Sequence, residues 1–495
     1  MRHAWRRTWL AGLAILVLAG FRLLALATGS GPATVDAGNW LAFAHDLLGD
    51  GVRSGVVYPP IVPLGVAACV TALGPTLGVA VAGTIAWAVA PLALWFHGRR
   101  AGAATMATVA AIVAGATTAT GEVLAWGGFP QLLAVGAVVV AMPFAVTWLR
   151  EGGRRSLCVV AVGYGVIAFT SHLVLVPALG ALALAVVLGA LIGRPGSPGT
   201  PRRAAVLAAL VAIVILPMVP VYVAILESVL VTGPGTRLGW ADVTRVLGAG
   251  WLVWCLAMTV APVVLASLRM RRVLPGGLPG DLLVAAAALA MAWLATIAAT
   301  GEVRFLHDVG VIASLSVLAG VIALRAAPAS ASFAREMIVA VALLGGVAST
   351  LAGIAAFGAQ VDYYRVLDPA TEKAVVWLGA NTAGDAVVAV PDHAGTPLWW
   401  VEGLAQRRAL LASELRWLRF PDERARAVAA ATLFYDSDFP SPASVARAAQ
   451  SGVSYILLPD IAPWNAVDLA AAPAPWRIAY ARDGVIVIDT GYVQP

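Results

Sequence analysis

A polar stretch between Gly29 and Pro60 interrupts a chain that is otherwise strongly apolar. It carries three carboxylates, Asp36, Asp46 and Asp50, just beyond the first hydrophobic segment. A bilayer tolerates carboxylates only where they face water, protein or a reacting group. The stretch is therefore either a candidate site for acid–base chemistry or a solvated loop.

Asp36 is the strongest candidate for a general base in this stretch. A carboxylate here can remove a proton from a hydroxyl group, and such proton transfer typically contributes about 10²- to 10⁴-fold to a rate. Asp is also a preferred residue in front of a helix, and a helix is expected to begin near Gly38. The sequence is consistent with either role, base or helix cap.

Further ionisable side chains fall in the other polar turns that are expected on the same side of the membrane. An arginine beside a histidine suits a phosphate group, since guanidinium presents a fixed fork of donors. A carboxylate can hold a divalent metal, Mg²⁺ or Mn²⁺, that neutralises phosphate. The candidates are Arg304 and His307 for phosphate, and Glu122 and His172 for a metal.

Each of these candidates has an ordinary alternative. Glu122 can be simply the polar residue that its turn requires, and His172 can be a buried structural histidine. An arginine at the outer end of a membrane span opposes the positive-inside tendency and therefore needs a specific anion. For Arg304 that anion can be a neighbouring carboxylate, Glu302 or Asp308, instead of a phosphate.

The composition indicates a protein that crosses a membrane several times. Of 495 residues, 60% are hydrophobic and 12% are charged, and the mean hydropathy is +0.87. A soluble domain carries roughly 25% charged residues. The net charge of +6 comes from short arginine-rich turns, not from a nucleic-acid-binding patch. Three cysteines in apolar segments predict no disulfide framework.

The distribution of arginines predicts the topology, because short basic loops stay on the cytoplasmic side. A basic amino-terminal segment precedes an apolar one at Trp9 to Thr28, which places the N-terminus in the cytoplasm. The segment from Pro59 to Leu73 is short and broken by prolines, so we expect a helix that lies in the outer interface. With the first helix, ten further spans give about eleven crossings. These spans are 76–96, 103–120, 130–149, 156–171, 173–193, 204–226, 247–268, 281–299, 309–325 and 337–357.

The region 358–495 lacks the long apolar runs of the preceding chain. This change predicts a small extracytoplasmic α/β domain after a membrane domain at 1–357. Its amphipathic and alternating segments predict helices at 369–381, 421–434 and 442–451, and strands at 385–390 and 453–458. The segment 476–490 predicts a hairpin that turns at Asp483 and Gly484.

Several short motifs together resemble those of the C-type glycosyltransferases, polytopic enzymes that use polyprenyl-phosphate-linked sugars. The resemblance rests on the acid in the first external loop (Val35 to Gly38), the Tyr58-Pro59-Pro60 turn before an interfacial helix, and the short basic turn at His97 to Arg100. It continues through Glu122 in the second external loop and the Arg304-Phe305 pair before a late span.

The carboxyl-terminal region is similar to the external domain of oligosaccharyltransferase-like members of that family. The segment from Trp399 to Gly403 is similar to a WWD-type acceptor-binding motif. Val401 and Glu402 stand where the motif has Asp and Tyr, which argues against recognition of a peptide sequon. Paired tryptophans also suit sugar stacking or a membrane-interface belt. The resemblance implies acceptor binding by Tyr58, Trp399, Trp400 and Glu402.

The resemblance also implies an activity. It implies an inverting membrane glycosyltransferase of the plasma (inner) membrane that transfers a hexosyl or pentosyl group from a polyprenyl-phosphate donor to an extracytoplasmic glycan, lipid or protein. Asp36 would be the general base, Arg304 and His307 would bind the donor phosphate, and Glu122 would hold a metal if one is present. Two alternatives remain, a transporter or flippase of lipid-linked glycans and a non-catalytic cell-envelope assembly protein. Transporters often show paired repeats, and none is visible here.

Overall fold

The structure is a computed structural model, and its chain contacts form two units. It describes residues 2–29, 31–49, 58–192, 200–232, 239–248, 251–270, 273–326, 332–391, 398–410, 439–459 and 472–492, with 425, 428–429, 432–434 and 469. The first unit, here the helical unit, contains Met1–Ala25, Gly83–Val219 and Gly235–Gln360. The second, here the mixed unit, contains Leu26–Ala82, Pro220–Pro234 and Val361–Pro495.

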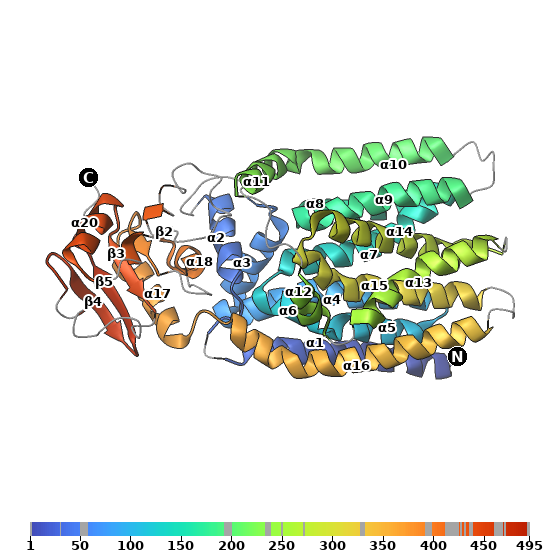
Figure 1. Ribbon diagram of the computed structural model, residues 1–495, viewed down its shortest axis with the longest axis horizontal. Helices are drawn as coiled ribbons and strands as arrows, with labels where there is room; N and C mark the ends of the chain where they lie inside the picture. The colour runs from blue at the N-terminus through green and yellow to red at the C-terminus, as the bar shows by residue number, and fades with distance from the viewer. Residues whose placement is uncertain are drawn as a thin grey trace. The chain divides into compact units, whose positions relative to one another are not determined.

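The helical unit consists of long apolar helices that run side by side (Figure 1). α7, α9 and α14 pack on one another, and α13 and α15 pack on α14 and on each other. The helices are α1 (Arg2–Ala27), α4 (Pro75–Arg100), α5 (Ala104–Ala116), α6 (Thr118–Trp126), α7 (Phe129–Glu151), α8 (Arg154–Ala168), α9 (His172–Ile192), α10 (Thr200–Ile215), α12 (Trp240–Leu247), α13 (Trp251–Met270), α14 (Gly277–Thr300), α15 (Val309–Arg325) and α16 (Ser332–Tyr364). Two 3₁₀ turns, η1 (Leu216–Met218) and η3 (Val303–Asp308), complete this unit. α11 (Val219–Thr232) belongs, after its first residue, to the mixed unit.

The described part of the chain contains seven helices long and apolar enough to cross a membrane, or eight if the bent pair of α5 and α6 is one span. The protein is therefore a multi-pass membrane protein, as its composition predicts. An apolar 18-residue window within Val303–Arg325 is completely buried, whereas only 22% of such a window within Pro201–Leu226 is, so the former is central and the latter peripheral. The three other predicted crossings fall on α1, α8 and α16 and stay predictions.

One predicted span is broken. The sequence predicts a continuous helix at 103–120, but α5 ends at Ala116 and α6 begins at Thr118 with a bend of 50°. Thr117 has an extended backbone, and its hydroxyl accepts from the Thr120 amide at 3.0 Å, which caps α6. Gly127, in the left-handed conformation, ends α6.

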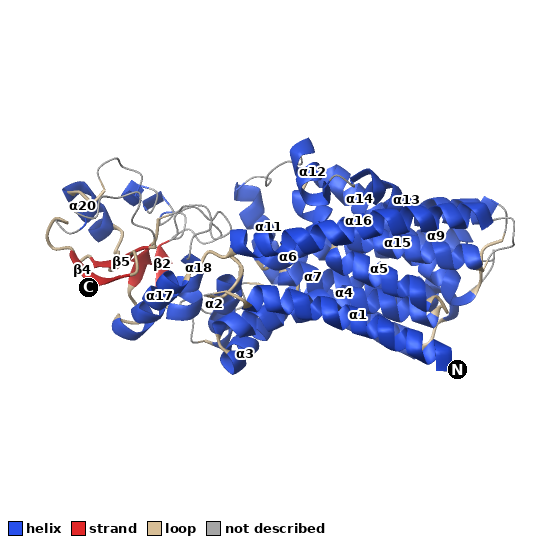
Figure 2. Ribbon diagram, turned by 90° about the horizontal axis from the view of Figure 1, so that it is seen from below, coloured by secondary structure: helices blue, strands red, loops and turns tan. Residues whose placement is uncertain are grey.

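The mixed unit contains the strands of the described chain (Figure 2). Its five-stranded sheet has the order β2-β1-β3-β5-β4, with β1 parallel to β2 and β3, and β5 antiparallel to β3 and β4. The strands are β1 (Val387–Ala389), β2 (Arg408–Leu410), β3 (Tyr455–Leu458), β4 (Arg477–Arg482) and β5 (Val485–Asp489). The helices are α2 (Ala37–Leu48), α3 (Ile61–Leu73), α17 (Pro369–Asn381), α18 (Leu398–Trp400), the π-helical turn η5 (Val401–Ala405) and α20 (Pro442–Gln450).

Most of the predicted elements of the C-terminal region are confirmed. α17 has the predicted bounds because Asp368 caps it and Pro369 begins it. The hairpin of β4 and β5 turns at Asp483 and Gly484, both at positive φ as such a turn requires. The helix predicted at 421–434 lies largely outside the described residues. β2 was not predicted. The boundary between 357 and 358, and the interfacial location of α3, stay predictions.

Candidate functional site

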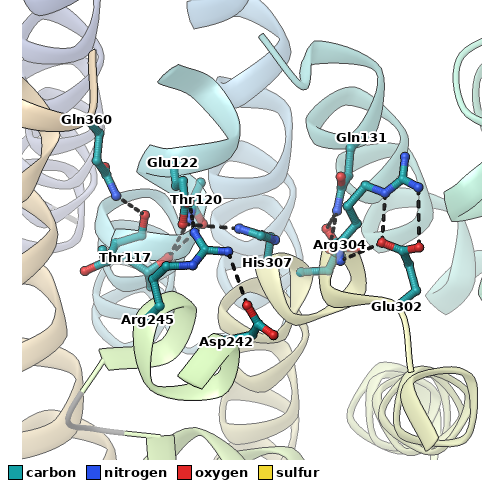
Figure 3. Close-up of polar contacts among 12 residues, drawn as sticks. Thr117, Thr120, Glu122, Gln131, Asp242, Arg245, Glu302, Arg304, His307 and Gln360 are labelled. Carbon is teal, nitrogen blue, oxygen red and sulfur yellow. Dashed lines mark hydrogen bonds and ion pairs between the residues drawn. The ribbon is translucent and has the colours of Figure 1, made fainter. Parts of the chain in front are cut away.

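A buried carboxylate–histidine pair forms the centre of the candidate site in the helical unit (Figure 3). Glu122 lies on α6 and His307 lies on η3, and the two side chains meet with 3.2 Å between Glu122 Oε2 and His307 Nε2. Glu122 is 5% exposed and His307 is 2% exposed. The indole of Trp126 contacts the imidazole edge-on, with 4.6 Å between ring centroids. The sequence predicts a functional role for both residues, but as a metal ligand for Glu122 and as a phosphate contact for His307.

A third residue, Arg245 of α12, completes this cluster and was missed by the sequence analysis. Its guanidinium forms an ion pair with Glu122 Oε1, while 52% of the arginine side chain stays exposed. Asp242, one turn earlier on α12, lies 4.0 Å from the same guanidinium. Each oxygen of the Glu122 carboxylate thus has its own partner, so the buried charge is compensated. The acid–arginine spacing of i and i+3 in a short amphipathic segment was the signal available in the sequence.

Arg304 lies on η3 but is bound to a different carboxylate. Its Nε and Nη2 donate to the two oxygens of Glu302 at 3.0 and 3.4 Å. Burial raises the pKa of the Glu302 carboxyl, but the hydrogen bonds and charge of Arg304 outweigh burial and hold that pKa below its ordinary value. The alternative anion left open by the sequence is therefore present. The Arg304 side chain remains 46% exposed.

A buried hydrogen-bond network fixes the turn that carries Arg304 and His307. Gln131 Nε2 donates to the Arg304 carbonyl at 2.8 Å and to Asp308 Oδ1 at 2.9 Å. Trp293 Nε1 donates to the other Asp308 oxygen at 3.1 Å. Gln131 lies on α7 and Trp293 on α14, so two long helices orient η3. These three residues support the site without belonging to it.

Asp36 lies in the mixed unit, where it is the residue before α2. It is half-buried, and its side chain forms no capping hydrogen bond. The Thr34 hydroxyl instead accepts from the Ala37 amide at 3.2 Å. Of the two roles that the sequence left open for Asp36, the cap is taken by another residue, whereas the role of base stays a prediction.

The residues predicted to bind the acceptor have unequal surroundings in the mixed unit. Tyr58 stacks on Phe43 at 5.2 Å between ring centroids and is itself half-buried. Trp399, Trp400 and Glu402 are 6%, 0% and 6% exposed. A Glu402 carboxylate oxygen accepts from a backbone amide of β2. Burial favours packing over direct sugar stacking for the two tryptophans.

The backbones of α2 and of the π-helical turn pack unusually close to each other behind these tryptophans. A Cβ atom on Gly38 would lie 2.7 Å from the backbone between Trp399 and Trp400, and one on Gly403 would lie 2.5 Å from the Gly38 carbonyl. Glycine is therefore required at both positions. This contact joins the segment after Asp36 to the C-terminal part of the mixed unit.

The predicted metal ligands do not form a metal site by their own arrangement. Both Glu122 oxygens are taken by Arg245 and His307, and His172 begins α9. In the part of the chain that the structure describes, no group of three or more His, Cys, Asp or Glu side chains is arranged to hold a metal ion.

Comparison with known proteins gives a clear fold and no close relative. No family model matches the sequence, and the comparison with curated proteins finds no significant match. The structure is similar to that of ArnT from Cupriavidus metallidurans bound to undecaprenyl phosphate, with TM-score 0.59, 14% identity and 99% of each chain covered. The chain has the C-type glycosyltransferase fold. The resemblance that its motifs predicted is confirmed at the level of the fold.

The same fold likeness extends to an oligosaccharyltransferase of Archaeoglobus fulgidus. In the structure of that enzyme tethered to an acceptor peptide with an NVT sequon, the TM-score is 0.58 at 13% identity, with 92% of this chain and 69% of that chain covered. A second structure of it, in complex with zinc and sulfate, gives a TM-score of 0.52 at 14% identity. At these identities the C-type fold is shared, and the role of each residue has to be argued from this chain.

Proposed function

We propose that this protein is a membrane glycosyltransferase that transfers a hexosyl or pentosyl group from a polyprenyl-phosphate donor to an extracytoplasmic glycan, lipid or protein. The proposal is supported by the C-type fold along 99% of the chain, shared with ArnT, whose structure contains undecaprenyl phosphate. It places the enzyme in the plasma membrane with its N-terminus in the cytoplasm and the C-terminal domain outside. The basic turns between the spans support this orientation.

In the proposed reaction, Asp36 removes the proton from an acceptor hydroxyl as the hydroxyl oxygen attacks the anomeric carbon of the donor. The bond between that carbon and the phosphate oxygen breaks, and polyprenyl phosphate leaves with the electron pair. Attack from the opposite face inverts the anomeric configuration. The proton ends on the Asp36 carboxylate, from which water removes it. Tyr58 is placed beside the acceptor, whereas Trp399, Trp400 and Glu402 hold α2 in position without direct contact.

The observation that carries the proposal is a half-exposed arginine held by a buried acid. Arg245 has Nη1 bound to Glu122 and Nη2 4.0 Å from Asp242, and 52% of its side chain remains exposed to a ligand. A leaving phosphate gains negative charge, and prearranged donors that already sit where this charge develops are an effective source of catalysis. We assign Arg245 this role, with His307 orienting Glu122, and Arg304 as a second anion contact once Glu302 releases it.

The proposal is tested with purified protein and a panel of labelled polyprenyl-phosphate sugars. Arg245→Lys keeps the charge but loses the fork, so donor KM should rise by about ten- to a hundredfold, as expected for hydrogen bonds to charged groups. Arg304→Lys should show a smaller rise, and Arg154→Lys, at an exposed position outside the site, should show none. Translocation of the donor without sugar transfer would instead identify a flippase.

A further inference from the structure

The break between α5 and α6 is held by side chains from three distant helices. α5 ends at Ala116, so the carbonyls of its last turn lack partners within the helix. The Gly115 carbonyl accepts from Trp87 Nε1 of α4 at 2.9 Å and from Arg22 Nη2 of α1 at 3.2 Å. Gln360 Nε2 of α16 donates to the Thr118 carbonyl at 3.1 Å. The bend is thus fixed by polar contacts as well as by packing.

Arg22 is an unexpected member of this set. It is completely buried, and its guanidinium carbon lies 3.9 Å from the centroid of the Phe357 ring. Its Nε and Nη1 have no hydrogen-bond partner, and no acid forms an ion pair with it among the residues that the structure describes. Burial of a charge without an opposite charge is costly. Because Trp87 already donates to the Gly115 carbonyl, backbone hydrogen bonding alone does not explain an arginine here.

The guanidinium lies directly behind the backbone that carries Glu122. A Cβ atom on Gly121 would lie 3.1 Å from Arg22 Nη1, 2.8 Å from Gln360 Oε1 and 3.2 Å from the Phe357 ring. A side chain at Gly121, the residue before Glu122, would therefore require Gln360 and Arg22 to shift. Figure 3 shows Gln360 and Thr117 beside the turn of α6 from which Glu122 projects.

We propose that Arg22 is a positioning residue for Glu122. It fixes the first turns of α6 from behind, so that the Glu122 carboxylate stays in contact with His307 and Arg245. Its positive charge also opposes the negative charge of that buried carboxylate, in surroundings where charges interact strongly. This inference rests on the proposed function, since it assigns Arg22 to the site that binds the donor phosphate.

The test compares Arg22→Met, Arg22→Lys and the matched control Trp87→Phe, which removes the other donor to the same carbonyl. Transfer by the methionine variant should fall on the order of 10²-fold, the effect of a misplacement of about 1 Å, and the lysine variant should recover most of it. The melting temperature of Arg22→Met should not fall, because replacement of an unpaired buried charge by an apolar side chain is often neutral or stabilising. Trp87→Phe should lower the melting temperature and keep kcat.

A double-mutant cycle with Glu122→Gln gives a readout that a purely structural role would not change. If Arg22 acts through Glu122, the double variant Arg22→Met/Glu122→Gln should be no less active than Glu122→Gln alone, since residues acting as a unit are not additive. If the transfer rate of the double variant falls by the product of the two single losses, the inference is overturned. It is also overturned if Arg22→Met and Trp87→Phe both lose transfer and both lower the melting temperature. If Arg22→Met does not fold, Gly121→Ala, which crowds both Arg22 Nη1 and Gln360 Oε1, must reproduce the loss.

Failure of the proposed function remains distinguishable in the same experiment. Full transfer and an unchanged donor KM in Glu122→Gln overturn the phosphate site itself. A severe loss in Glu122→Gln with full activity in Arg22→Met overturns only the role of Arg22.

Discussion

Glu122 illustrates how a single buried acid organises a site in an apolar medium. A carboxylate that is 5% exposed is stable as an ion only when its oxygens are paired, and removal of one partner of such a pair typically costs about 3 to 5 kcal/mol. Arg245 and His307 provide the two partners from different helices. The acid therefore determines where the arginine is held, and the arginine is the group that reaches solvent.

The general-base role of Asp36 is tested by Asp36→Asn, with Thr34→Val as the matched control. The asparagine keeps the size of the side chain but loses the basic oxygen, so transfer should fall by about 10²- to 10⁴-fold with folding unchanged. Thr34 supplies the cap of α2, so its valine variant should lose on the order of 1 kcal/mol of stability and keep its transfer rate. The transfer rates and melting temperatures of the two purified variants distinguish a catalytic role from a structural one. Asp36→Asn within a few-fold of the parent would assign the base elsewhere.

Individual residues of the site were predicted with uneven success. Glu122 and His307 stand out in the sequence because only 12% of the residues are charged, yet their pairing could not be predicted from positions 185 residues apart. Arg245 was missed because it lies next to an ordinary polar turn and nothing in the sequence distinguishes it from the other arginines. Trp399 and Trp400 look like binding aromatics in the sequence, but the structure buries both side chains and packs the backbone between them against Gly38.

At the scale of elements, the contact between α2 and the π-helical turn gives a specific prediction. Gly403→Ala places a methyl group 2.5 Å from the Gly38 carbonyl, so α2 must move. We expect a loss of about 1 to 3 kcal/mol of stability and, if Asp36 is the base, a fall in kcat on the order of 10²-fold. Gly384→Ala, where nothing lies within 4 Å, is the control and should change neither. A stable Gly403→Ala protein with normal kcat would separate this contact from catalysis.

Elements with strong local signals were predicted from the sequence, and those made by tertiary contacts were not. α17 and the β4–β5 hairpin have caps and turn residues that act locally. The break at Thr117 gives little signal, because the apolar character continues across it and the Gly115 carbonyl beside it is satisfied by Arg22 and Trp87, which are distant in sequence. The strand β2 has only three residues and exists through its pairing with β1.

For the whole molecule, the arginine pattern predicts that the C-terminal domain lies outside the cytoplasm. In a background in which the three native cysteines are changed to alanine, single cysteines at exposed Ala383 and Arg202 report the two sides. A membrane-impermeant thiol reagent should label Ala383→Cys in intact cells, and Arg202→Cys only after lysis. Labelling of both, or of Arg202→Cys alone, in intact cells would reverse or reject the proposed orientation.

The mixed unit is assembled from chain segments that leave the ribosome at very different times. Its first segment ends at Ala82 and its last begins at Val361, so at a synthesis rate of 5–20 residues per second the roughly 280 residues between them take about 15 to 60 s to appear. During that interval the segment that packs on Gly38 of α2 has not been synthesised, although the membrane spans between them are already being inserted. The contact of Gly38 with Trp399, Trp400 and Gly403 therefore forms only after residue 403 has been synthesised, and a chain that stops before residue 361 lacks this partner of α2.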